Sequence, residues 1–118
     1  METLSDAAVD RIFRALADAT RRDIVRRTLT EAVTVSALAA AYDMSFAAVQ
    51  KHVSVLETAG LVTKNRHGRE RLVRGDVDTL RKAQSLLDRY EAIWRQRIDR
   101  LDSLLAEGRP GDQAPDSD

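Results

Sequence analysis

The sequence TVSALAAAYDMSFAAVQKHVSVLETAG, residues 34–60, contains two short amphipathic patterns on either side of a break at residues 43–45. Before the break, four apolar residues recur at the spacing of one helix face: Val35, Leu38, Ala39 and Tyr42. After the break, four more do so: Phe46, Val49, Val53 and Leu56. Thr34 or Ser36 can cap the first helix, and Gly60 is a typical residue for ending the second. Two helices joined by so tight a turn predict a helix-turn-helix.

After Gly60 the pattern changes to that of a β-hairpin over residues 61–74. Gly68 supplies the positive φ that a short hairpin loop requires. A basic hairpin directly behind a helix-turn-helix predicts a wing, which reaches phosphates or the minor groove while the second helix enters the major groove. Six wing residues are candidates for this contact: Lys64, Arg66, His67, Gly68, Arg69 and Arg71.

The second helix of the motif is the candidate recognition helix. With Val49 pointing inward, Ala47, Lys51, Ser54 and Thr58 project away from the core, and Gln50 and Ala48 flank that outer face. Eight residues of this segment are the candidates for DNA contact: Ser45, Phe46, Ala47, Ala48, Gln50, Lys51, His52 and Ser54. Gln50 can pair bidentately with adenine, and Lys51 can donate to guanine or phosphate. For His52 two interpretations stay open, a bond to the backbone or a neighbouring carboxylate, and a phosphate contact.

Two further helices are predicted upstream, over residues 6–17 and from an Asp18 cap to about Leu29. Ser5 or Asp6 can cap the first of them. Four residues of the second are expected to face inward: Ile24, Val25, Thr28 and Leu29. Arg21 and Arg22 open this helix, where they either approach phosphate or pair with Asp18 or with acidic residues of the last helix.

Residues 78–107 contain no glycine or proline and predict roughly 45 Å of helix. Its apolar stripe is longer than a small core can cover, so we expect a two-fold homodimer. Nine residues are candidates for the interface: Val9, Ile12, Phe13, Leu87, Tyr90, Trp94, Ile98, Leu101 and Leu105. Tyr90 and Trp94 lie one turn apart, which fits either packing or an aromatic ligand pocket.

The chain has 118 residues, 43% hydrophobic and 32% charged, which fits one compact domain. We expect a winged helix-turn-helix DNA-binding and dimerisation domain over residues 1–107. Residues 108–118 combine Gly, Pro and Asp without a sizeable apolar group, and we expect a disordered tail. The sequence lacks a run of about 20 apolar residues and a signal-peptide pattern, so no membrane partner and a cytoplasmic location are expected.

Charge is unevenly distributed along this neutral chain. Residues 11–74 contain twelve basic and six acidic side chains, a net charge of +6, and the flanking segments are acidic. A field of that sign attracts polyanions such as DNA.

The residues that catalysis or metal binding would need are missing from the sequence. It has no cysteine and two histidines, without a zinc-ligand spacing, a nucleophile elbow or a glycine-rich phosphate loop. We therefore predict no enzyme activity, no metal site and no cofactor.

Two segments carry a resemblance to a known family: FRALADATRRDI, residues 13–24, and VQKHVSVLETAGLV, residues 49–62. With the hairpin behind them, they resemble the arsenic-repressor (ArsR) family of bacterial winged-helix regulators over about residues 9–105. The pattern of Trp94, Arg97 and Leu101 is similar to that of the cysteine-free branch, which lacks metal-sensing motifs. Ala19 replaces a common proline and Gln50 a common serine, so the operator sequence does not transfer.

The expected fold class is mainly α (α+β), a winged helix-turn-helix with five helices, a two-stranded hairpin wing and a long C-terminal dimerisation helix. The resemblance implies a homodimeric, sequence-specific transcriptional regulator, usually a repressor acting at its own or a nearby promoter. An inverted-repeat operator and an unidentified small-molecule effector fit this expectation. The alternative is a winged-helix module that binds proteins and does not use its recognition helix on DNA.

Overall fold

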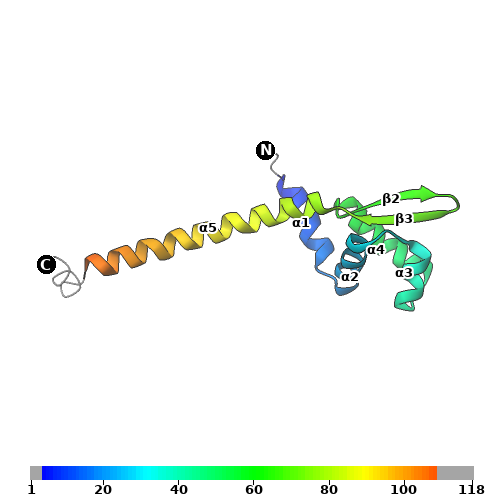
Figure 1. Ribbon diagram of the computed structural model, residues 1–118, viewed down its shortest axis with the longest axis horizontal. Coiled ribbons are helices and arrows are strands. Elements are labelled where there is room, and N and C mark those ends of the chain that lie inside the picture. The colour runs from blue at the N-terminus through cyan, green and yellow to red at the C-terminus, as the bar shows by residue number, and fades with distance from the viewer. Residues whose placement is uncertain (1–3, 109–118) are drawn as a thin grey trace. The chain divides into compact units, whose positions relative to one another are not determined.

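The computed structural model describes residues 4–108, and the predicted five helices and hairpin are confirmed (Figure 1). The elements follow in this order: α1 (Asp6–Leu16), α2 (Ala19–Thr30), β1 (Val33–Thr34), α3 (Val35–Tyr42), α4 (Phe46–Thr58), β2 (Val62–His67), β3 (Glu70–Gly75) and α5 (Val77–Glu107). They form two compact units, which divide within α5 after Ala83. Apart from Gly108, the predicted tail lies outside the described residues.

The first four helices begin where a short polar side chain accepts a hydrogen bond from a backbone N–H three residues on. The caps are Ser5, Asp18, Thr34 and Ser45, with donor–acceptor distances of 3.0 to 3.1 Å. The choice between Thr34 and Ser36 is thereby resolved in favour of Thr34, and the choice between Ser5 and Asp6 in favour of Ser5. These local signals fix where each helix starts.

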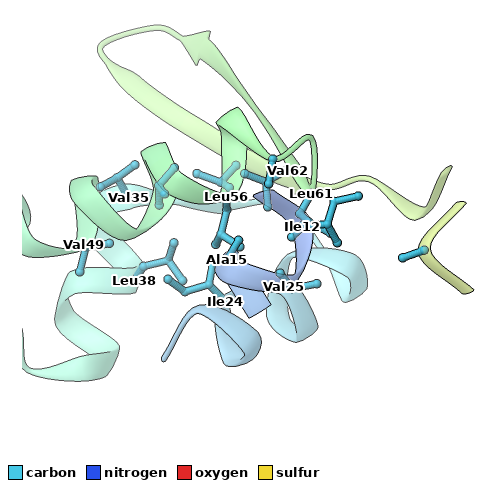
Figure 2. Packing of buried hydrophobic residues seen from close by; sticks show 14 residues of the cluster. Ile12, Ala15, Ile24, Val25, Val35, Leu38, Val49, Leu56, Leu61 and Val62 are labelled. Carbon is cyan, nitrogen blue, oxygen red and sulfur yellow. The ribbon is translucent and has the colours of Figure 1, made fainter. Parts of the chain in front are cut away.

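The core of the first unit is built from the inward faces of α1 to α4 and from the hairpin (Figure 2). Its largest fully buried side chains are Ile12, Ile24, Val35, Leu38, Val49, Val53, Leu56, Leu61, Val62 and Val73. Burial of these side chains supplies the hydrophobic stabilisation of the domain.

Two residues differ from their predicted environments. Ile12, predicted at a dimer interface, is 1% exposed and belongs to this chain's own core, because its face of α1 packs on α2 and α4. Leu29, predicted to face inward, is 42% exposed. At about 100° per residue, Leu29 lies about 40° beyond Val25 and about 90° from the centre of the stripe formed by Ile24, Val25 and Thr28.

The sheet has one strand more than predicted. The two-residue strand β1 pairs with β3, with Val33 opposite Val73, and gives the antiparallel order β1-β3-β2. Gly68 has φ +66° and is the first central residue of the loop between β2 and β3, as in a type II′ turn.

Candidate nucleic-acid interface

The turn between α3 and α4 sets the direction of the recognition helix. Asp43 adopts the left-handed conformation with φ +53°, which ends α3, and the N–H of Met44 donates to the carbonyl of Ala39 at 3.1 Å. The side chain of Met44 packs against the core, and Ser45 then caps α4. Only three residues, 43–45, separate α3 from α4, as in a helix-turn-helix.

The outer face of α4 is open to a partner. Ala47, Lys51 and Ser54 are exposed there, and α4 contributes most of the lining of a shallow depression of about 810 Å³. Seven of the eight predicted recognition residues line it, and the eighth, Ser45, is the helix cap. Two further residues line it: Arg21, which we expected near either phosphate or a carboxylate, and Val55, which we did not predict at this site. Val55 directly follows Ser54 in the sequence. Because it is apolar, its residue type alone suggests a core position and not an exposed one.

Gln50 lies differently from the other recognition residues. It is half-buried, and its Oε1 is buried without a hydrogen-bond partner among the described residues. A buried carbonyl oxygen without a donor is costly. The predicted bidentate contact with adenine therefore requires the side-chain amide of Gln50 to turn outward. This rotation would also move Oε1 to a place where it can accept a hydrogen bond.

His52 and Arg21 interact beside the recognition helix. Nη1 of Arg21 lies 3.4 Å from Nδ1 of His52, and Oδ2 of Asp18 lies 3.9 Å from the same ring nitrogen. These neighbours fit the first interpretation of His52, in which the ring interacts with a nearby carboxylate and not with phosphate. The backbone N–H of Arg21 lowers the pKa of the Asp18 carboxyl, and the nearby His52 and Arg21 side chains lower it further.

Arg21 and Arg22 close the end of α1. Arg21 donates through Nε to the carbonyl of Ala15 at 2.8 Å and through Nη2 to that of Arg14 at 3.1 Å. Arg22 donates to the carbonyl of Leu16 at 2.8 Å. The guanidinium groups thus bind backbone carbonyls in the last turn of α1, rather than the predicted carboxylates.

The wing carries a pair of like charges. Arg66 on β2 lies directly opposite Arg71 on β3, and paired residues of antiparallel strands share one face of the sheet. Arg69 occupies the loop, and His67 pairs with Glu70. Like charges directly opposite one another destabilise a hairpin in isolation. The pair of Arg66 and Arg71 therefore favours the binding of an anion, which would reduce their repulsion.

Lys64 is not at the exposed part of the wing. Its side chain is 10% exposed, and its Nζ lies 4.0 Å from Oε1 of Glu57 on α4. Because side chains alternate between the two faces of a strand, Lys64 of β2 points toward the recognition helix. In the structure it joins the wing to α4. The other predicted wing residues are exposed: Arg66, His67, Gly68, Arg69 and Arg71.

The predicted interface residues other than Ile12 retain accessible surface. Phe13 on α1 is exposed and Val9 is half-buried. On α5, Ile98 is half-buried, and the five other predicted apolar side chains are exposed in the single chain: Leu87, Tyr90, Trp94, Leu101 and Leu105. Two residues that we did not predict, Ile93 and Leu104, are exposed as well. A groove on this part of α5 is lined by Trp94 but not by Tyr90, so the aromatic pair does not form a pocket there.

Among residues 4–108, none of the helices combines the length and the hydrophobicity that a membrane span needs. The same residues contain no group of three or more histidine and acidic side chains arranged to hold a metal ion.

An exposed recognition helix followed by a basic hairpin defines the class of winged helix-turn-helix regulators, and comparison with known proteins agrees. A family model described as a helix-turn-helix domain matches residues 16–65. The HTH-type transcriptional regulator Rv2034 of Mycobacterium tuberculosis is 40% identical over 81 residues, 69% of this chain and 76% of that protein.

Two solved structures are similar over most of the chain. An ArsR-like transcriptional regulator from Rhodococcus sp. RHA1 is 31% identical with a TM-score of 0.74, over 83% of this chain and 92% of that one. The homodimeric winged helix-turn-helix DNA-binding domain of Mb0332 from Mycobacterium bovis is 24% identical with a TM-score of 0.60, over 77% and 91%. The protein belongs to the ArsR family of winged helix-turn-helix transcriptional regulators, which confirms the resemblance.

Proposed function

We propose that this transcriptional regulator is a homodimeric repressor that binds an inverted-repeat operator through α4 and the wing. The observation that carries the proposal is the placement of cationic side chains around an open helix face. Lys51 is exposed on the outer face of α4, and Arg66 and Arg71 oppose one another on the wing that Lys64 joins to α4. A duplex presents base edges to such a helix and phosphates to such a wing.

The homodimer is supported by the apolar side chains of α5. Seven large ones between residues 84 and 107 are exposed in the single chain, and an unpaired surface of this kind favours association. The M. bovis domain of the same fold is homodimeric. Two recognition helices related by a two-fold axis would read half-sites about 34 Å apart. A dimer held across a promoter would block its use, which is the basis for proposing repression.

The test is operator binding by the full chain. We would measure its affinity for DNA from upstream of its own coding sequence and for a random duplex of equal length, over several salt concentrations. We expect Lys51→Ala and Gln50→Ala each to weaken operator binding by about 5- to 150-fold, the range for loss of one base contact of 1–3 kcal/mol, with dimerisation unchanged.

Arg89→Ala is the matched control, because Arg89 is exposed on α5, belongs to neither α4 nor the wing, and its replacement by alanine removes one positive charge, as Lys51→Ala does. It should leave operator affinity within about twofold. Unchanged affinity in both the Lys51 and the Gln50 variants would refute the assignment of α4 as the DNA-reading helix.

One observation favours a second candidate function, a protein-binding winged helix. Phe46 is 51% exposed and Val55 is 39% exposed, both beside the outer face of α4. If the chain bound its upstream DNA no better than random duplex at every salt concentration, this apolar surface would identify α4 as a protein-docking helix instead.

A further inference from the structure

Helix α1 has two different exposed sides. Phe13 and Val9 lie on one side and belong to the proposed dimer interface. Arg11 and Arg14 are exposed on the other side, because Arg11 is about 200° around the helix from Phe13 at about 100° per residue. The basic side of α1 is therefore free of the role proposed for its apolar side.

The basic side of α1 adjoins the recognition helix. Arg11 and Arg14 line a groove of about 360 Å³ together with Ser54, Val55 and Thr58 of α4. Ser54 and Thr58 are exposed on the outer face of the C-terminal half of α4. A ligand lying along that face would meet both guanidinium groups.

Neither guanidinium group is neutralised within residues 4–108. Arg11 and Arg14 lie three residues apart on one helix, where like charges repel. The acidic residue at the matching helical spacing is Asp10, four residues before Arg14, and no ion pair within 4.0 Å joins them. An anion bound between the two arginines would relieve the repulsion.

The wing flanks a different side of α4. Glu57 lies 4.0 Å from Lys64 of β2, and the α4 residues of the groove, Ser54, Thr58 and Val55, project about 60° to 160° around the helix from Glu57. One pair of like-charged arginines, Arg66 and Arg71, is thus on the wing side, and a second pair is on the α1 side. The major groove that receives a recognition helix is likewise bordered by two phosphate strands, with an opening of about 12 Å.

We infer that Arg11 and Arg14 bind phosphates of one DNA strand bordering the groove while the wing binds phosphates of the other. The inference rests on the proposed function and adds α1 as a third DNA-contacting element. It commits to the duplex backbone as occupant because the arginine pair continues the surface of the recognition helix and has the charge complementary to phosphate. These contacts position the protein and carry no base preference.

The test uses the full chain and a duplex of about 30 base pairs, nearly three helical turns, selected by the parent protein from a random library. We expect Arg11→Gln/Arg14→Gln to reduce the slope of log affinity against log salt by about 1.8 per protomer, at about 0.9 per phosphate contact. The preference for the selected duplex over single-base variants should not change. Arg11→Lys/Arg14→Lys should keep the slope, and Arg81→Gln/Arg89→Gln on α5 is the control of equal charge.

Phosphate-ethylation interference locates the contacts on individual strands. We expect Arg11→Gln/Arg14→Gln to abolish interference on one strand. We expect Arg66→Gln/Arg71→Gln to abolish it on the other strand. If the parent binds its selected duplex but the α1 variant keeps the same salt slope and footprint, this inference is overturned while the proposed function stands. Loss on the same strand in both variants would also overturn it. Failure of the parent to select any duplex would overturn the proposed function, and the inference with it.

Discussion

A single carboxylate, that of Asp23, connects α2 to α3. Asp23 on α2 accepts from Nε of Arg27 at 2.7 Å, from Nε of Arg26 at 3.0 Å and from the hydroxyl of Tyr42 at the end of α3. Arg27 also lies over the Tyr42 ring, 5.2 Å from its centroid. The hydrogen bond from Arg27, followed by those from Tyr42 and Arg26, lowers the pKa of Asp23. Burial and the bond to Asp23 raise the pKa of Tyr42 to about 12.

Replacing Tyr42 tests this connection. Tyr42→Phe removes the hydroxyl but keeps the ring, and we expect the free energy of unfolding to fall by about 1 kcal/mol at pH 7, since the site is partly solvated. The difference from the parent should shrink as the pH falls below about 4, where the Asp23 carboxylate begins to be protonated in the unfolded chain and then in the folded one. Urea denaturation measures both effects.

Tyr90→Phe is the matched control, since Tyr90 is 59% exposed on α5. An equal loss in the Tyr42 and Tyr90 variants would show that the bond to Asp23 contributes nothing to stability.

Among the elements, β3 places the wing relative to the helices. It lies between β1 and β2 and ends at Gly75, beside Leu29 near the end of α2. A Cβ at position 75 would lie 2.8 Å from Cγ of Leu29 and 3.0 Å from its backbone nitrogen. Only glycine fits here without a shift, because Leu29 lies against this end of the strand.

Gly75→Ala should therefore shift the base of the wing. We expect it to lower the free energy of unfolding by about 1–3 kcal/mol, the usual cost of overpacking, as measured by urea denaturation. Adding Leu29→Ala should recover only part of the loss, because the backbone nitrogen remains in the way. Full stability in Gly75→Ala would contradict this close approach.

For the whole molecule, the apolar face of α5 makes association the main expectation. We predict that Leu101→Arg weakens the dimer at least about 100-fold, because a charge replaces a side chain that association would bury. Sedimentation equilibrium measures the dissociation constant. Ser103→Arg adds the same group to the polar side of α5 and should leave the dimer intact. A parent protein that is monomeric at micromolar concentration would contradict the proposed assembly.

Local signals made the five helices and the hairpin predictable. These signals are helix caps such as Asp18 and Thr34, the helical spacing of apolar residues, and Gly68 in the hairpin loop. Each acts over a few residues, so it can be recognised without knowing the fold. The strand β1 was missed because two residues carry no periodicity, and it exists only through its pairing with β3.

What lies around each side chain was settled only by tertiary packing. The pattern of α1 shows that Ile12 must be covered but not whether its own core or a partner covers it, and the core does so. In the same way, composition marks Lys64 and Arg21 as basic, while the folded chain turns the first toward Glu57 and the second onto the end of α1. Periodicity along a chain identifies which face is buried, whereas the neighbour that buries or neutralises a residue comes from elements distant in sequence.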